Sequence, residues 1–523
     1  MDNLKMQTQM VTLSTLLVSI SIVLLLPRVF SSPDVIGDIY WWCNQTPYPE
    51  QCKYHMNYIP KLTSVIQRQQ FLTRAEQAAL QEVNSALQFI KSLEPKVISN
   101  AERSAWTNCL IFYDLTIYRL NKTLDTTIKS TADDIQTWLS AAATNMRTCN
   151  DGFLDLGMTD NIYPLVISNN ATQLISNCLA VNFVITQHIE DIKQDALFLN
   201  ISRKDEPFRI SADCVVAQDG SGNYRTINEA LGASARRTHM HFVIHVKQGI
   251  YKEIVNVTQS DIVLIGDGID KTVITGNRKL PDGISLYECA TFKVTGDGFK
   301  AFLITFENTA GVEAGQAVAM ASYSDRSVFY YCAFKGYQDT LYANSNRQFY
   351  KKCLIYGTVD FIFGNAGAVF QDCTIYARKP KIQGGLVVTA QGRASPHENT
   401  GITIHRCSFM RAPELRPFPQ YKAFLGRPWR DFSRTVYLRS SIGDLVDPAG
   451  WMAWVGAPQS RYYKLDYGEF QNYGAGASTY GRVKWRGYHV INDLRTAEAY
   501  DVTNLINGNL WLPATTVPFD ADV

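Results

Sequence analysis

Three short stretches in the second half of the chain share one pattern: Val328-Phe-Tyr-Tyr-Cys-Ala-Phe334, Gln348-Phe-Tyr-Lys-Lys-Cys-Leu-Ile355 and Ala368-Val-Phe-Gln-Asp-Cys-Thr-Ile375. They place Cys332, Cys353 and Cys373 at intervals of 21 and 20 residues, and a fourth copy at 402–409 contains Cys407. A period near 20 residues, built of short β-branched and aromatic runs, is typical of a right-handed parallel β-helix that stacks like residues on like. A β-sandwich is the alternative, but the hairpin turns that it would need are hard to find.

Similar runs lie on either side of these repeats and are separated by Gly, Asp and Asn. The clearest are 241–246, 262–265, 272–275 and 401–405. Short runs bounded by turn residues predict strands. We therefore assign 212–523 to one all-β domain.

The earlier part of the sequence has a helical period instead. Thr73-Arg-Ala-Glu is a capping-box pattern, and apolar residues recur at helical spacing after it until Pro95. Three further patterns run through Trp106, Leu110, Tyr113 and Ile117, through Ile135, Trp138, Leu139 and Ala142, and through Leu174, Cys178, Val181 and Ile185. Together they predict an antiparallel helical bundle, so the chain is expected to have two domains.

Residues 191–211 predict a linker between these domains. They are charged and polar and include Pro207, and Arg203-Lys204 is a candidate processing site.

The first 32 residues have the layout of a secretory signal peptide. Lys5 precedes an apolar run from Val11 to Leu26, which Pro27 and small residues follow. The run is short for a membrane span, which needs about 20 apolar residues. Cleavage and secretion are favoured, and an uncleaved anchor is the alternative because Arg28 follows the run directly.

The composition fits export and argues against a nucleic-acid partner. Lys and Arg (50) nearly balance Asp and Glu (48), which gives a formal net charge of +2 and no strong positive field. Eleven cysteines in an exported chain predict disulfides, and the odd number leaves at least one thiol unpaired. Sequons predict N-glycosylation at Asn44, Asn121, Asn170, Asn200 and Asn256.

Polar residues recur in the β-helical half with the period of its coils. Gln316, Gln338 and Asp360 follow one another at intervals of 22, so they are expected to stack on one face with Asp339 beside Gln338. A carboxylate can attack an ester carbonyl while amide N–H groups hold the oxyanion and a neutral carboxylic acid protonates the leaving alcohol. A guanidinium such as that of Arg427 would keep one carboxylate ionised. The alternative is a polar ladder that only closes hydrogen bonds along the solenoid.

Cys353 and Cys373 lie one coil apart. Adjacent coils are about 4.8 Å apart, a separation that a disulfide tolerates. The residues alone leave two readings open, a disulfide and a ladder of buried free thiols.

Five segments resemble the signatures of plant pectin methylesterases. They are Gly249-Ile-Tyr-Lys-Glu253, Gln316-Ala-Val-Ala319, Gly336-Tyr-Gln-Asp-Thr-Leu-Tyr342, Gly357-Thr-Val-Asp-Phe-Ile-Phe-Gly-Asn-Ala366 and Leu425-Gly-Arg-Pro-Trp429. They stand in the family's order, and the resemblance extends from Ala212 to near the C-terminus. It implies a pectinesterase, an aspartyl esterase that hydrolyses the C6 methyl esters of polygalacturonan in the cell wall to carboxylate and methanol.

The resemblance also assigns roles. Asp360 would be the nucleophile, Asp339 the proton donor and then the base, and Gln316 and Gln338 the donors that hold the transition state. The residues implied to contact the substrate are Gln316, Arg427 and Trp429. Arg427 would also orient Asp360, and Trp429 would stack on a sugar ring, with a merely packed aromatic as the alternative. In this family Cys353 and Cys373 match a bonded pair, and no metal or cofactor is needed.

The helical half resembles the pectin methylesterase inhibitor domain over about 36–190. That domain is a four-helix bundle preceded by a helical hairpin, and Cys43-Asn-Gln-Thr-Pro-Tyr-Pro-Glu-Gln-Cys52 carries much of the match. The resemblance implies the disulfides Cys43–Cys52 and Cys109–Cys149, with Cys178 unpaired. The expected partners are pectin, the chain's own helical region acting as an autoinhibitory pro-region, and free inhibitor proteins.

Three residues depart from the family pattern. Gly315 stands where the family usually has His, Ala321 where it often has Arg, and Leu286 where a substrate-contacting Thr is common. The linker also lacks the family's usual processing motif. The alternative function is therefore a catalytically impaired homologue that acts as an inhibitor or wall-binding protein. A polygalacturonase or pectate lyase would need further carboxylates or calcium ligands, which the motifs do not supply.

Overall fold

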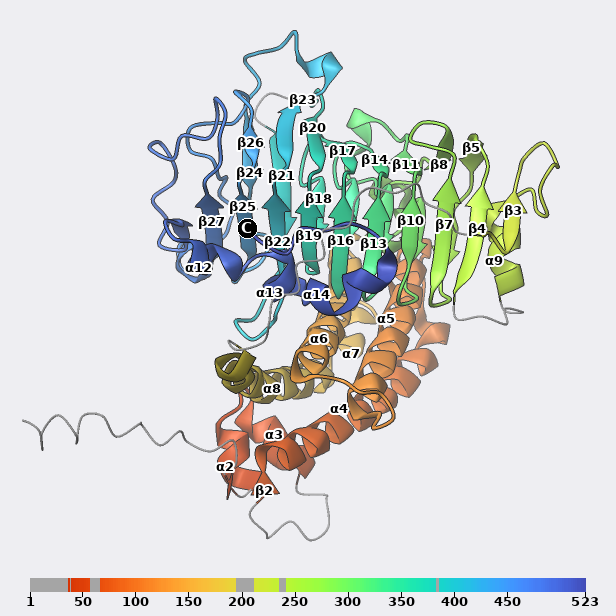
Figure 1. Cartoon of the computed structure of the whole chain (residues 1–523). Coiled ribbons are helices and arrows are strands. Elements are labelled where there is room, and N and C mark those ends of the chain that lie inside the picture. Colours follow the sequence, from red (N-terminus) through yellow and green to blue (C-terminus); the bar gives the residue numbers. More distant parts are fainter. Residues whose placement is uncertain (1–35, 38, 57–65, 194–210, 235–240, 382–384) are drawn as a thin grey trace, which may run out of the picture.

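The computed structural model describes residues 36–37, 39–56, 66–193, 211–234, 241–381 and 385–523. The predicted signal peptide, Arg203-Lys204 and Asn200 lie outside these residues. The described chain is helical up to Lys193 and consists mainly of parallel strands from Cys214 onward (Figure 1). No helix in the described ranges combines the length and apolarity needed to cross a membrane.

Four long helices form the bundle of the first half. They are α4 (Arg68–Ser92), α5 (Asn100–Leu124), α6 (Ala132–Asp155) and α8 (Ala171–Lys193). Shorter elements are the pair β1 (Ile36–Gly37) and β2 (Ile66–Gln67), the hairpin of α2 (Ile39–Asn44) and α3 (Pro49–Met56), the 3-10 turn η1 (Glu94–Lys96), and α7 (Tyr163–Val166). The three helical patterns after Pro95 are confirmed as α5, α6 and α8.

Both disulfides predicted for the helical half are present. Cys43–Cys52 closes the α2–α3 hairpin, and Cys109–Cys149 joins α5 to α6. Cys178 is a buried free thiol, as predicted. A crosslink between two cysteines that lie 40 residues apart in sequence restricts the unfolded chain and so stabilises the bundle.

The capping box predicted at Thr73 is wrong. Helix α4 already begins at Arg68, and the Thr73 hydroxyl donates to the carbonyl of Gln69 at 3.1 Å from within the helix. Phe71 and Leu72 are fully buried, so an additional apolar turn extends the helix toward the N-terminus. A true capping box instead opens α6, where Thr131 and Asp134 satisfy each other's backbone N–H groups.

The second half is a parallel β-helix, as the repeats predicted, and its described strands form three sheets. In the described residues one sheet comprises β3 (Cys214–Val216), β4 (Phe242–Val246), β7 (Ile262–Gly266), β10 (Lys300–Phe302), β13 (Ser327–Tyr330), β16 (Arg347–Lys351), β19 (Gly367–Gln371), β22 (Gly401–His405), β25 (Arg434–Leu438), β27 (Asp466–Phe470) and β28 (Tyr488–Val490). The second comprises β5 (Gly249–Lys252), β8 (Thr272–Gly276), β11 (Thr305–Asn308), β14 (Ala333–Lys335), β17 (Leu354–Gly357), β20 (Thr374–Ala377), β23 (Ser408–Arg411) and β26 (Ser441–Ile442). The third comprises β6 (Val255–Val257), β9 (Phe292–Val294), β12 (Met320–Ser322), β15 (Leu341–Ala343), β18 (Ile362–Gly364), β21 (Leu386–Gln391) and β24 (Ala423–Gly426).

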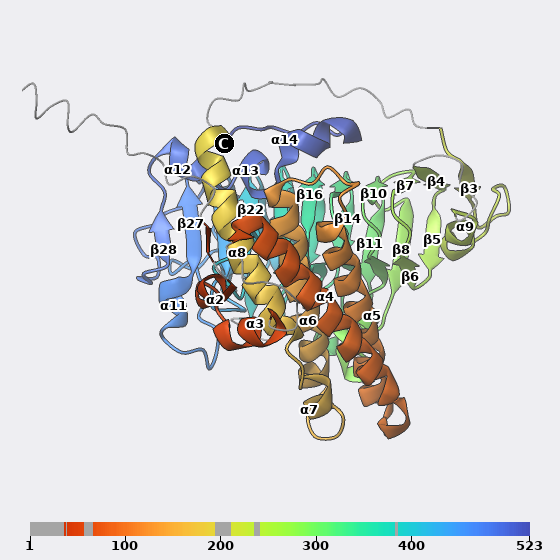
Figure 2. The same ribbon diagram turned by 90° about the horizontal axis from the view of Figure 1, so that it is seen from below.

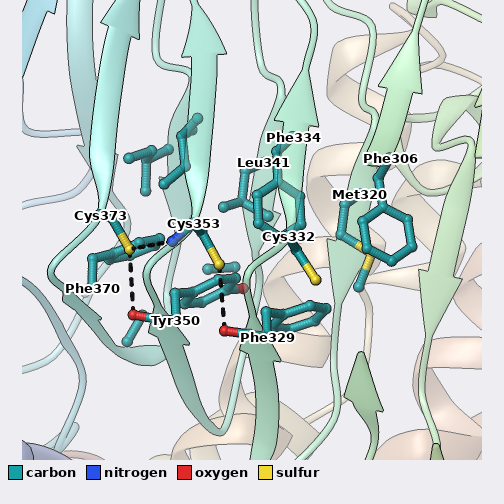
Figure 3. Packing of buried hydrophobic residues seen from close by; sticks show 14 of the residues in the cluster. Phe306, Met320, Phe329, Cys332, Phe334, Leu341, Tyr350, Cys353, Phe370 and Cys373 are labelled. Atoms are coloured by element: carbon teal, nitrogen blue, oxygen red, sulfur yellow. Dashed lines mark hydrogen bonds between the residues drawn. The ribbon is translucent and has the colours of Figure 1, made fainter. Parts of the chain in front are cut away.

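The predicted stacking of like on like is observed in the core. Phe329, Tyr350 and Phe370 occupy equivalent positions on successive coils, with ring centroids 4.8 and 4.4 Å apart and nearly parallel planes (Figure 3). Such aromatic pairs contribute about 0.5–1.5 kcal/mol each beyond the burial of their area.

The prediction of a disulfide between Cys353 and Cys373 is wrong, and the alternative of a buried thiol ladder holds. Both cysteines are free and buried. The Cys353 thiol donates to the carbonyl of Phe329 at 3.3 Å, and that of Cys373 donates to the carbonyl of Tyr350 at 3.4 Å while accepting from Cys353 N (Figure 3). Each sulfur therefore has backbone partners in the stack, without a covalent bond to the neighbouring coil.

Short helices complete the second half. They are α9 (Ile227–Ala233), α10 (Leu286–Cys289), α11 (Arg461–Lys464), α12 (Leu494–Glu498), α13 (Val502–Ile506) and α14 (Gly508–Trp511). The 3-10 turns are η3 (Leu280–Asp282), η4 (Val312–Ala314), η5 (Pro413–Leu415) and η6 (Leu512–Thr515). Helices α13 and α14 pack apolar side chains on the outer face of the first sheet (Figure 1).

The helical half packs on the outer face of the third sheet (Figure 2). Apolar side chains of α4, α5, α6 and α8 form one buried cluster with residues of that sheet and its flanking loops, namely Leu286, Tyr287, Val318, Ala321, Tyr323, Tyr342, Phe363 and Ala390. At its centre the ring of Phe112 lies 5.5 Å from that of Tyr287 and 5.7 Å from that of Tyr323. The two halves thus share a continuous apolar core.

Candidate active site

The predicted polar residues meet at the turns that lead into the third sheet. Gln316 forms a parallel bridge with Gln338, shortly before β12 and β15. Leu341 pairs with Ile362, so counting back along both strands places Asp339 opposite Asp360. The predicted stacking of Gln316 on Gln338 is confirmed, whereas the expected register of Gln338 with Asp360 is wrong by one residue. The carboxylate that faces Asp360 across the coils is therefore Asp339.

Both aspartates have a left-handed backbone. Asp339 has a φ of 61° and Asp360 a φ of 49°, a region that Asp tolerates better than most residues. Strand β18 ends at Gly364, with a φ of 122°, where an added Cβ would lie 2.0 Å from the carbonyl oxygen of Ala343. This close approach fixes the end of β18 against the preceding coil.

Arg427 holds the Asp360 carboxylate. Its Nε donates to Oδ1 at 2.8 Å and its Nη2 to Oδ2 at 2.6 Å, in the two-pronged geometry of a strong charge-assisted pair. The guanidinium also lies 4.5 Å from the centre of the Trp454 ring. Trp454 was not identified from the sequence, because it follows Arg427 by 27 residues in a loop with no recognisable motif.

Asp339 has a different environment. Gln316 Nε2 donates to its Oδ2 at 2.9 Å, and no cation forms an ion pair with it among the described residues. Burial and then the charge of Asp360 raise the pKa of Asp339 well above its usual range. Burial also raises the pKa of Asp360, but the hydrogen bonds from Arg427 oppose that rise. Asp339 therefore holds a proton more firmly than Asp360, which separates the two carboxyls into an acid and a base.

Amide and aromatic groups surround this pair. The half-buried Gln338 side chain makes no hydrogen bond within the described residues, so its N–H groups are available to a ligand. Trp429 lies over Gly392, where an added Cβ would be 2.9 Å from the Trp429 ring. Its ring is 6.2 Å from that of Phe363 on β18. Trp429 thus lies close to the strand that follows Asp360.

Charged residues of the helical half reach the same region. Asp151 of α6 binds Arg430 Nη2 through both carboxylate oxygens, at 2.5 and 2.6 Å. Asp155, at the end of α6, is near enough to Asp339 to raise the pKa of that group. The sequence offered no signal for these contacts, since Asp151 and Arg430 alone lie 279 residues apart.

Further ion pairs fix the helices against the β-helix. Arg119 and Lys122 of α5 both bind Asp297, and Arg347 bridges Asp134 of α6 to Asp325 of its own half. These pairs flank the apolar cluster, so the position of α5 and α6 is specified by both burial and charge.

Two of the three departures from the family pattern lie in this contact area. Ala321 and Leu286 are buried in the shared cluster. Ser285, beside Leu286, accepts a hydrogen bond from Asn108 of α5. Gly315 has a φ of 68° and nothing within 4 Å of an added Cβ, so it leaves space next to Gln316.

The predicted glycosylation sites differ in exposure. Asn44, Asn121 and Asn256 are exposed, and Asn170 is half-buried. They remain predictions.

Comparisons with known proteins match both halves. A family model described as Pectinesterase matches residues 213–509, and one described as Plant invertase/pectin methylesterase inhibitor matches 37–181. "Pectinesterase 2" of Citrus sinensis is 45% identical over 482 residues, which cover 91% of this chain and 93% of that protein. "Probable pectinesterase/pectinesterase inhibitor 17" of Arabidopsis thaliana is 44% identical over 487 residues, which cover 92% and 94%.

Two solved structures are also similar. The pectin methylesterase from carrot has a TM-score of 0.58 and 44% identity, and the match covers 61% of this chain and 100% of the carrot chain. The pectin methylesterase from Aspergillus niger has a TM-score of 0.51 and 31% identity, with 61% and 99% covered.

Proposed function

The chain belongs to the pectinesterase family and is a pectin methylesterase with an inhibitor-like helical region, and from this premise we propose that Asp360 is its nucleophile. The observation that carries the proposal is the asymmetry of the two carboxyls. Asp360 is bound by Arg427, whereas the facing Asp339 forms no ion pair with a cation of the described residues and has a strongly raised pKa. One group is thus suited to attack and the other to donate a proton.

The reaction would proceed in two steps. An oxygen of Asp360 attacks the carbonyl carbon of a galacturonate methyl ester, and the N–H groups of Gln316 and Gln338 bind the oxyanion. The bond to the methoxy group breaks, Asp339 gives its proton to that group, and methanol leaves. Asp339, now a carboxylate, takes a proton from water, which attacks the acyl carbon and releases Asp360. The products are free carboxylate and methanol, and Asp339 has its proton again.

Arg427 and Trp429 would hold the polymer. Arg427 orients Asp360 and contacts substrate at the same point, while Trp429 presents an aromatic ring to a sugar. The chemistry needs no metal or cofactor, because Asp339 and the amides supply the proton and the oxyanion contacts.

The helical region would keep the enzyme silent. We assign it to 36–190 as an autoinhibitory pro-region, with 191–211 as the linker and 212–523 as the catalytic domain. Support comes from the packing of α5 and α6 beside the catalytic turns and from the pair between Asp151 and Arg430. Free inhibitor proteins of the same fold would compete for this surface. The signal peptide and sequons further suggest a secreted glycoprotein of the cell wall.

The decisive experiment measures methanol release from highly methylated pectin by the 212–523 segment and its Asp360→Ala variant. The whole carrot chain aligns with 61% of this one, which supports independent folding of such a segment. Release that disappears in the variant is expected. No release from folded protein would instead favour the catalytically impaired homologue that acts as an inhibitor or wall-binding protein.

A further inference from the structure

Arg430 makes a charged contact that the esterase reaction does not explain. It lies three residues after Arg427 in the loop that follows β24, with a half-buried side chain. Within the described residues its guanidinium forms one ion pair, and the partner is Asp151 of the helical half. The described part of the β-helix therefore supplies no carboxylate for Arg430, and separation of the halves would remove the counter-charge that Asp151 provides.

The surroundings of the pair are those of a binding site for an acidic sugar. Arg430 lies 5.1 Å from the centre of the Trp429 ring, so a cation and an aromatic ring are adjacent. Tyr342 of β15 and Asn344, which directly follows that strand, line the same cavity between the two halves. Guanidinium groups bind carboxylates through paired hydrogen bonds, and sugar rings stack on aromatic faces. The carboxylate of Asp151 occupies this place in the intact chain.

We propose that Arg430 and Trp429 form a subsite for the free carboxylate of an already de-esterified galacturonate unit, and that Asp151 occupies this subsite as a mimic of that carboxylate. The proposal rests on the proposed function, because it gives a place in the groove to a neighbour of the ester under attack. Each turnover creates one such carboxylate in the polymer. An enzyme with this subsite would prefer esters that have free acid units beside them.

The subsite also gives the helical region a local means of inhibition. Asp151 is carried by the rigid helix α6, which Cys109–Cys149 ties to α5, so its carboxylate is held at the position where the polymer would bind. A polymer carboxylate must displace it to reach Arg430. Substrate rich in free acid would therefore compete with docking more strongly than fully esterified substrate.

Calorimetry on the full-length chain tests the subsite without turnover. The proteins are the parent, Asp151→Asn, Arg430→Gln and the double variant, all carrying Asp360→Asn so that no ester is consumed. The probes are a de-esterified oligogalacturonate and its fully methyl-esterified counterpart. Asp151→Asn is expected to bind the acid oligomer about tenfold or more tightly than the parent, the effect of one charge-assisted contact. The gain for the esterified oligomer is expected to be clearly smaller.

The double variant shows whether the gain in affinity comes from a carboxylate subsite at Arg430 or from a general loosening of the helical half. Loss of the acid preference when Arg430→Gln is added supports the proposal, and Arg430→Lys is expected to retain part of it. Three outcomes would overturn the proposal. The preference for the acid oligomer could survive without Arg430, Asp151→Asn could raise the affinity for both oligomers equally, or Asp151→Asn could leave the affinity for the acid oligomer unchanged. Thermal unfolding of each variant checks folding. Calorimetry measures binding and not methanol release. The binding result can therefore be interpreted even if Asp360→Ala does not abolish methanol release.

Discussion

Arg119 of α5 holds both carboxylate oxygens of Asp297, at 2.7 and 2.8 Å, and joins the helical half to the β-helix. The Arg119 side chain is only 2% exposed, and its second acceptor is the carbonyl of Tyr323. Lys122 binds the same carboxylate at 2.9 Å. A buried pair of this kind adds little net stability when intact, but loss of one partner leaves an uncompensated buried charge.

Asp297→Asn is therefore expected to weaken docking of the helical half, at a cost of about 3–5 kcal/mol, because Arg119 remains buried without its anion. If docking inhibits the enzyme, methanol release by the full-length variant should rise above that of the parent. Paired measurements of thermal unfolding and methanol release check this. Glu50→Gln is the control, since its pair with Lys53 is exposed and should change stability by less than about 1 kcal/mol. If Asp297→Asn weakens the interface between the halves but methanol release stays at the parent's rate, autoinhibition by docking is contradicted.

Arg427→Gln should move the acidic limb of the pH–rate profile to higher pH. The guanidinium opposes the rise in the pKa of Asp360, so its removal raises that pKa, and a higher pH is then needed to ionise the nucleophile. A shift of about 1–3 pH units is expected, together with a lower rate at acidic pH. Methanol release by the 212–523 segment across the pH range measures it. Arg427→Lys, which keeps the charge, should shift the limb less, and a rate loss with no movement of the limb would count against this role.

Removal of the amide of Gln338 should affect the chemical step more than binding. A lost oxyanion donor costs about 10²–10³ in kcat, and Gln338 has no other side-chain hydrogen bond to lose among the described residues. Gln338→Ala is compared with Gln248→Ala, which removes an exposed amide elsewhere on the β-helix. A large rise in KM with unchanged kcat would show that Gln338 binds the ground state instead.

The β-helical architecture could be predicted from the sequence because each sequence repeat corresponds to one coil of the fold. Equivalent residues such as Cys332, Cys353, Cys373 and Cys407 recur once per coil, and the strands pair in the register that these intervals require. The register predicted from the sequence was wrong where two successive coils differ in length by one residue. Gln316 pairs with Gln338 across 22 residues, but the following coil spans 21, so Asp339 and not Gln338 faces Asp360.

Contacts between the halves could not be predicted, since no periodicity relates an α-helix to a distant loop. Arg430 and Asp151 are unremarkable charges in sequence, and only the docking of α6 brings them together. The family resemblance identified Arg427 and Trp429 by motif but gave no signal for Trp454, whose contact with Arg427 depends on the course of a later loop.

Thiol labelling distinguishes the buried ladder from the disulfide typical of the family. Seven cysteines are free and buried, and four form the two disulfides, which accounts for all eleven. Alkylation of the unfolded, unreduced protein followed by mass spectrometry should therefore modify seven residues. The folded protein should resist labelling, because burial also raises the pKa of thiols such as Cys353 and Cys407. Five labelled cysteines, with Cys353 and Cys373 unmodified, would restore the disulfide.

Asp155 should make docking of the helical half depend on pH. Burial and the nearby charge of Asp151 raise the pKa of Asp155 to about 7, with Arg430 acting in the opposite sense. The charge of Asp155 in turn helps to raise the pKa of Asp339. The ordinary pKa of Asp is about 3.9, so between about pH 4 and 7 the docked state binds more protons than the separated or unfolded chain. The contribution of Asp155 to docking is thus greatest below about pH 4 and is lost as pH rises through 7.

Asp155→Asn stays neutral and should lack this dependence. Comparison of Tm for the full-length protein and the variant from pH 4 to 8 isolates the effect, since all other titrating groups are common to both. The Tm of the variant relative to that of the parent should rise progressively up to about pH 7, and the difference should then stay constant. Asp133→Asn, in the first turn of α6, removes a carboxylate from the same helix and is the matched control for substitution in α6. A Tm difference for Asp155→Asn that stays constant from pH 4 to 8 would show that this carboxyl has an ordinary pKa in the docked chain.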